Sequence, residues 1–139
     1  MAASAGLRGP VYLDCLTYPP ASDLERCRRS LRWVAALRDS GPTGVAPLVA
    51  IGNLGHGASR EECHAWQMTY VTMTMAAGAR AMILPVEDAA LVSLVRVLEG
   101  HAAPRTAFEE WAVELCAGGG DVPPPGERLR SSWELLRDP

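Results

Sequence analysis

Three short apolar segments, each followed by a segment with helical periodicity, limit the folds open to this chain more than any other feature of its sequence. They span residues 11–16, 45–51 and 81–84, so they recur about every 35 residues. Pro47 weakens the start of the second segment, so its strand is expected from Leu48 onward. Regular strand–helix alternation favours parallel strands joined by crossover helices. The sequence therefore predicts an α/β fold of three parallel βα units, with a buried first strand.

Capping residues mark the expected starts of the helices in these units. Ser22 with Glu25, and Ser59 with Glu62, have the spacing of capping boxes. Asp88 is expected in the first turn of the third helix, where an acidic side chain interacts favourably with the helix dipole. Each of the three helices is expected to end at a glycine.

The pattern changes beyond residue 100, where the remaining segments have helical periodicity only. Pro104 is expected to open a helix that ends at the glycine triplet 118–120. Residues 121–126 are expected to form a stiff proline-rich linker, followed by a short amphipathic helix over 129–136. We therefore divide the chain into a βα region, residues 1–100, and a helical C-terminal extension, residues 101–139.

Composition narrows the functional classes. The chain has 139 residues, 48% of them hydrophobic and 21% charged, and a net charge of −3, which is typical of a globular protein that does not bind nucleic acid. All its basic residues are arginines, which excludes Schiff-base lysines and a phosphate-loop lysine. The four cysteines form no CxxC pair, so we expect buried reduced thiols and no metal centre. Without a secretory signal or about 18 consecutive apolar residues, the chain is expected to be cytoplasmic, without membrane contact.

Two polar residues lie where the first two apolar segments end. The C-terminal ends of parallel strands are where α/β proteins bind ligands. Asp14, flanked by apolar residues, either contacts a ligand or caps a neighbouring loop. Asn53 either contacts a ligand or forms a turn, because asparagine tolerates left-handed backbone geometry.

A glycine-rich loop leads from Asn53 to the start of the second helix. Gly55 and Gly57 belong to this loop, and the backbone N–H groups at a helix start bind phosphate or another anion, although a simple turn explains the same glycines. His56 is either a proton donor to a ligand or an exposed loop histidine. Arg60 either attracts an anionic ligand or is a solvated arginine.

Three segments, in this order, resemble the pterin-binding (dihydropteroate synthase-like) barrel family, especially its methyltetrahydrofolate methyltransferases, which pass a methyl group to a corrinoid. VYLDCLTYP, residues 11–19, resembles the segment in which an aspartate ends a barrel strand and binds the pterin ring. IGNLGHGASR, residues 51–60, resembles the Ser-Asn-x-Ser-Phe-Gly loop and the helix after it. AGARAMILP, residues 77–85, resembles the last strand. The resemblance covers about residues 11–100 and implies the last three units of an eight-unit TIM barrel.

By this resemblance Asp14 binds the pterin ring, and Asn53 and His56 address the N5 position. Gly55, Gly57 and Arg60 then belong to the loop that contacts the cofactor, tetrahydrofolate or 5-methyltetrahydrofolate, including its glutamate tail. The loop departs from the family at both serine positions and at its aromatic position. The synthase branch carries a lysine at the position of Asn53, so synthase activity is not expected.

The implied function is a folate-binding subunit of a split methyltransferase. The first five units of the barrel are absent, so a second polypeptide or further copies would supply them, with cobalamin on a partner, and catalysis would exist only in the complex. One alternative is a noncatalytic interaction or scaffold module that forms a homo- or hetero-oligomer. A weaker one is a small-molecule binding protein that uses the glycine loop for a phosphate-bearing ligand.

Overall fold

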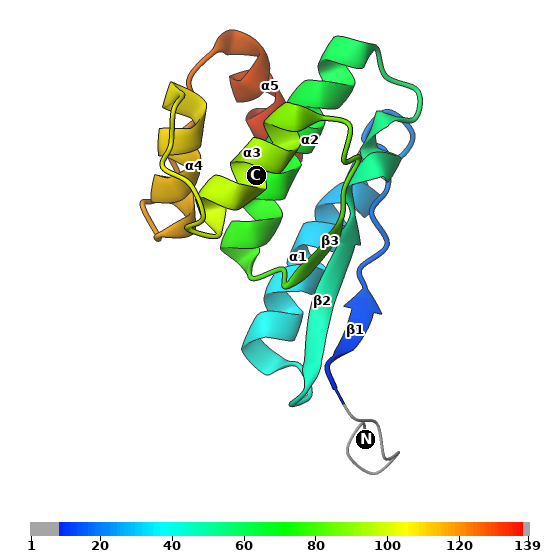
Figure 1. Cartoon of the computed structure of the whole chain (residues 1–139). Helices are drawn as coiled ribbons and strands as arrows, with labels where there is room; N and C mark the ends of the chain where they lie inside the picture. Colours follow the sequence, from blue (N-terminus) through cyan, green and yellow to red (C-terminus); the bar gives the residue numbers. More distant parts are fainter. Residues whose placement is uncertain (1–8, 138–139) are drawn as a thin grey trace.

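The chain folds into a parallel sheet with helices along one of its faces (Figure 1). The computed structural model describes residues 9–137, so the ends of the two expected regions, 1–8 and 138–139, lie outside the described residues. The sheet has three strands in the order β1-β2-β3, and both neighbouring pairs are parallel. The predicted α/β fold of three parallel βα units is therefore confirmed. The strands are β1 (Val11–Asp14), β2 (Val45–Ala50) and β3 (Ala81–Ile83).

The central strand β2 begins at Val45, earlier than the sequence predicts, and it includes Pro47. The carbonyl of Pro47 accepts a hydrogen bond from the Arg80 N–H at 3.1 Å, so Pro47 faces the β3 side of the sheet. Pairing with β3 starts one residue later, where Leu48 lies opposite Ala81. Proline is tolerated here because the N–H that it lacks falls before the β2–β3 ladder begins.

Three helices alternate with the strands: α1 (Leu24–Ser40), α2 (Arg60–Ala77) and α3 (Ala89–Leu98). The capping box of Ser59 and Glu62 at the start of α2 is confirmed. The box expected at Ser22 is wrong, because the side chain of Asp23 is the N-cap of α1 and accepts the Arg26 N–H at 2.9 Å. Asp88 likewise precedes its helix as the N-cap of α3, rather than lying in its first turn.

Two further helices, α4 (Ala107–Cys116) and α5 (Glu127–Leu136), form the C-terminal extension. Helix α4 begins at a capping box of Thr106 and Glu109, so Pro104 lies outside it, contrary to the sequence prediction. The expected linker joins the two helices, and the Trp111 indole N–H fastens it by donating to the Val122 carbonyl at 2.8 Å.

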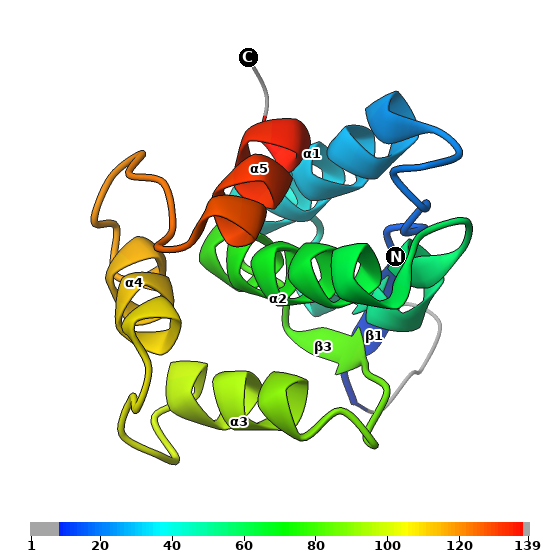
Figure 2. The same cartoon turned by 90° about the horizontal axis from the view of Figure 1, so that it is seen from above.

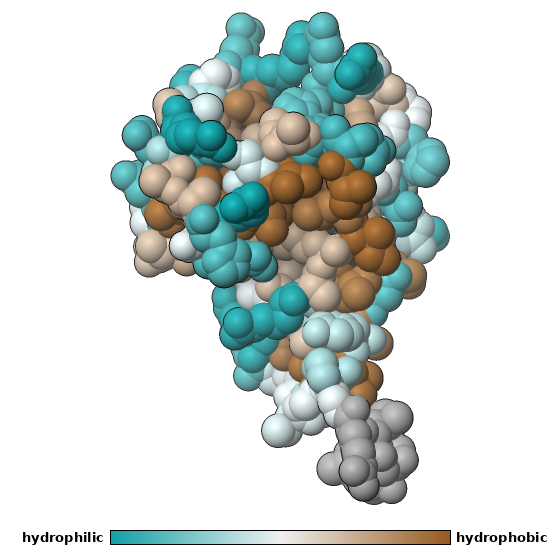
Figure 3. Space-filling view, in the orientation of Figure 1, coloured by the Kyte–Doolittle hydropathy of each residue, from teal (hydrophilic) through white to brown (hydrophobic). Residues whose placement is uncertain are grey.

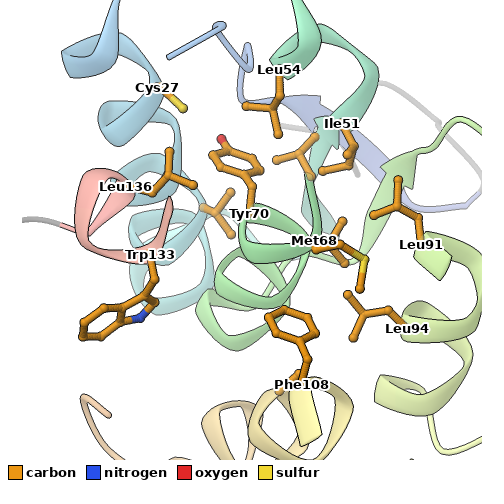
Figure 4. Packing of buried hydrophobic residues seen from close by; sticks show 14 of the residues in the cluster. Cys27, Ile51, Leu54, Met68, Tyr70, Leu91, Leu94, Phe108, Trp133 and Leu136 are labelled. Atoms are coloured by element: carbon orange, nitrogen blue, oxygen red, sulfur yellow. The ribbon is translucent and has the colours of Figure 1, made fainter. Parts of the chain in front are cut away.

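Helix α2 is the centre of the hydrophobic core. It lies between α1 and α3 and packs against α4 and α5 on the side away from the strands (Figure 2). Tyr70 is fully buried and points between Cys27 and Leu54, while Leu91 and Leu94 lie on the opposite side of α2 (Figure 4). None of the helices in the described part of the chain is both long and apolar enough to cross a bilayer.

The other face of the sheet has no helix against it. The strand register places Tyr12 beside Ala46, and Ala50 beside Ile83, on this face. Tyr12 is 50% exposed and Ile83 is 59% exposed. Three of the four residues of β1 are exposed, so the expectation of a buried first strand is wrong. Apolar surface gathers over the upper part of the strands (Figure 3). We call this side of the sheet the open face.

Ser59→Ala is expected to lower the free energy of unfolding by about 1 kcal/mol, because it removes the capping box of the central helix. Ser22→Ala is the matched control, and its effect is expected to stay within about 0.5 kcal/mol because Asp23 caps α1. Urea denaturation of both variants measures the difference. Equal losses would contradict the assignment of the two caps.

Candidate functional site

Asp14 is the last residue of β1, at the C-terminal end of the sheet. Its Oδ1 accepts the Leu16 N–H at 2.9 Å. Leu16 has a φ of 49°, a left-handed conformation that is uncommon for leucine, and the carboxylate stabilises this turn. Within the described residues, the Oδ2 atom of Asp14 has no protein partner. The loop-capping interpretation of Asp14 is confirmed, and one carboxylate oxygen stays available to a ligand.

Asn53 lies in the 3-10 helix η2 (Ile51–Gly55), which follows β2 directly. Its side-chain N–H donates to the Thr17 carbonyl at 3.4 Å, and the Thr17 hydroxyl accepts the Ala50 N–H at 3.3 Å. These two bonds tie the loop after β1 to the end of β2. Asp14 and Asn53 therefore lie on adjacent, connected loops at one edge of the sheet, as the sequence predicts for a shared ligand site.

The glycine-rich loop is shaped by packing and turn geometry. A Cβ atom at Gly55 would lie 2.6 Å from the Cys63 sulfur, so any larger residue would require the Cys63 side chain to move. Gly57 has a φ of 82°, in the left-handed region that favours glycine. His56, between them, is exposed. Turn geometry at Gly57 and packing at Gly55 therefore account for the two glycines without a bound anion.

The structure does not bring all the candidate residues into one pocket. Asp14 lines a groove of about 540 Å³ between β1 and α1. Arg60 is exposed at the start of α2 and lines a different pocket, of about 970 Å³, between α2 and α3. A ligand held by Asp14 in its groove would therefore not occupy the pocket that Arg60 lines.

The second pocket holds a histidine–aspartate pair that the sequence analysis missed. His64 Nδ1 lies 2.9 Å from Asp88 Oδ2, and Asp88 Oδ1 accepts the N–H groups of Ala90 and Leu91 at 3.0 and 3.2 Å. Burial raises the pKa of Asp88, but the hydrogen bonds from Leu91, His64 and Ala90 outweigh burial, and the pKa lies below its ordinary value. The sequence could have shown that Asp88 caps α3, because an aspartate just before a helix is a common N-cap. It could not have shown the contact with His64, which depends on how α2 packs beside α3.

The cysteines are free thiols, as expected. Cys15 and Cys27 are buried, whereas Cys63 and Cys116 are only partly buried. Burial raises the pKa of Cys27 to about 12 and that of Cys116 to about 11, so both stay protonated near neutral pH. A thiolate nucleophile is therefore not expected at either position.

Comparisons with protein-family models, curated proteins and solved structures find no match to this chain. The resemblance to pterin-binding barrels therefore stays a prediction.

Asp88→Asn is expected to destabilise the protein near neutral pH and to have a smaller effect in acid. Because the pKa of Asp88 is lowered by folding, its carboxylate adds stability above the unfolded-state pKa, and that stability is lost as the pH falls through the folded-state pKa. Urea denaturation of wild type and variant at about pH 6 and about pH 3 measures the two differences. An equal difference at both pH values would contradict a charge-dependent role.

Proposed function

We propose that the chain is the folate-binding part of a split barrel methyltransferase, in which a partner polypeptide supplies the remaining strands. One observation carries the proposal: three parallel strands expose an apolar face, and Asp14 and Asn53 lie on adjacent loops at the C-terminal end of the same strands. In a barrel this face points inward, and its C-terminal end holds the ligand.

The open face supports the need for a partner. Parallel sheets are normally covered on both faces. Here the helices cover one face, while Tyr12 and Ile83 on the other face are each about half exposed. Exposed apolar patches flanked by unpaired strand edges are typical of surfaces that another protein covers. Partner strands that close the barrel would bury both residues.

The residues on the loops at the C-terminal end of the strands have suitable chemistry for a reduced folate. When bound, such a folate would supply a methyl group on N5. The free Oδ2 of Asp14 can accept hydrogen bonds from the 2-amino and ring N–H groups of a pterin. Asn53, anchored to Thr17 through its N–H, keeps its side-chain oxygen for a ligand. His56, exposed on the same loop, can donate a proton close to N5.

A second candidate is a noncatalytic interaction module with the same open face. It is favoured by the structural roles of the polar residues, because Asp14 accepts the Leu16 N–H and Asn53 donates to the Thr17 carbonyl. Packing and backbone conformation likewise explain the glycines at positions 55 and 57 without a ligand. This candidate also requires a covered open face. It differs in that the assembled protein has no affinity for folates.

The deciding experiment uses the tagged chain isolated together with the polypeptide that assembles with it. Titration calorimetry with 5-methyltetrahydrofolate is expected to show binding by the complex, weakened at least about tenfold by Asp14→Ala. Asp14→Asn keeps an oxygen for the Leu16 N–H, so it separates loss of charge from loss of the turn. Asp39→Ala, an exposed carboxylate near the end of α1, is the matched control and should bind normally.

Two results would overturn the proposal. Folate binding that is unaffected by both Asp14 variants would exclude the carboxylate from the site. A stable assembly with no affinity for folates would support the noncatalytic module instead.

A further inference from the structure

Strand β1 has an unpaired edge. The Val11 N–H donates to the Gly44 carbonyl at 3.0 Å and the Cys15 N–H to the Leu48 carbonyl at 2.9 Å, so these residues face β2. In a parallel ladder alternate residues face opposite neighbours, so the backbone groups of Tyr12 and Asp14 point outward. Within the described residues no strand pairs with them. The carboxylate of Asp14 already satisfies the Leu16 N–H, so the free edge ends there.

Apolar side chains surround this edge. Four of the eight large hydrophobic residues that are exposed in the described chain lie on β1, just after it, or on α1 beside it. They are Tyr12, Leu13, Leu16 and Trp33. Leu13, Leu16 and Trp33 line the groove between β1 and α1, while Tyr12 lies on the open face. Free edge strands are usually protected by charges, prolines or covering segments, so apolar residues on both faces indicate an edge that is covered in the assembled protein.

The groove also carries charged side chains, one of them the Asp14 carboxylate described above. Two arginines line it, Arg26 and Arg29. Arg26 forms an ion pair with Asp23 at 3.1 Å and lies over the Tyr18 ring. Arg29 is exposed and forms no ion pair within the described residues. An acidic side chain on an occupant of the groove would complement Arg29.

We infer that the β1 edge is the docking site for an extended segment of a different polypeptide. The segment adds a short parallel strand beside Tyr12 and Asp14, packs apolar side chains against Leu13 and Trp33, and places a carboxylate at Arg29. This inference rests on the proposed function, because it names the strand edge at which the partner chain would join the barrel.

A second copy of the chain fits this edge less well. Two-fold symmetry would pair β1 with its own counterpart in antiparallel orientation. It would also bring together two grooves that each carry an unpaired Arg29. Two arginines placed together oppose association, whereas a partner with an acidic residue beside Arg29 can form an ion pair with it.

Two capped synthetic peptides test the inference on the full chain, one alternating valine with glutamate and one alternating valine with lysine. The glutamate peptide is expected to bind more tightly. Its binding should shift the NMR signals of the outward amides of Tyr12 and Asp14 more than those of Val11 and Cys15, which already donate to β2. It should also change the fluorescence of Trp33, and Trp33→Phe should remove that change.

Arg29→Glu is expected to weaken binding of the glutamate peptide about fivefold and to strengthen binding of the lysine peptide. Arg96→Glu, the same charge change at an exposed position of α3, is the matched control and should leave both affinities unchanged.

Three results would overturn the inference: no binding of either peptide, amide shifts at β3 instead of β1, or self-association of the free chain that Tyr12→Pro abolishes. The third result would assign the edge to a second copy. Failure here is separable from failure of the proposed function, because the peptide titration contains no folate. Asp14→Asn should weaken folate binding by the complex while peptide binding persists, and Arg29→Glu should weaken peptide binding by the free chain.

Discussion

The burial of helix α2 is the constraint on which the rest of the structure depends. This helix lies between α1 and α3, with the strands on one side and α4 and α5 on the other. Its residues 67–72 are all buried. The Thr72 hydroxyl donates to the Met68 carbonyl at 3.1 Å and the Thr74 hydroxyl to the Tyr70 carbonyl at 2.8 Å, so these two hydroxyls keep hydrogen bonds inside the core. Within the described residues, the buried hydroxyls of Thr69 and Tyr70 have no such partner. The C-terminal helices thus complete the helical layer and leave the open face of the sheet uncovered.

This one-sided coverage links the fold to both candidate functions. All five helices lie on or beyond one face of the sheet, so the described chain has no element left to cover the other face. Both candidate functions require another polypeptide there, and they differ only in whether Asp14 and Asn53 contact a folate. The place proposed for the start of that pairing is the β1 edge, beside the exposed Trp33 and the unpaired Arg29 of α1.

Sequence predictions succeeded where the relevant interaction joins residues that are close along the chain. The Ser59–Glu62 box and the alternation of strands and helices depend on spacings of a few residues, which the sequence displays directly. The box at Ser22 failed because the neighbouring Asp23 competes for the same N–H groups and wins the cap. The start of β2 was predicted too late, because the effect of Pro47 on the strand depends on which neighbouring strand the proline faces. The candidate residues Asp14 and Asn53 could be identified, but their bonds to Leu16 and Thr17 could not.

By itself the sequence determined the three βα units, their parallel pairing and the capping of the central helix, because period and capping are local properties of a chain. Only the tertiary structure decided which apolar residues are buried. It left Tyr12 and Ile83 exposed, separated Asp14 from Arg60, and placed His64 beside Asp88. The physical reason is that burial depends on what packs against an element, and an apolar strand has the same sequence whether its second face is covered by its own chain or by another.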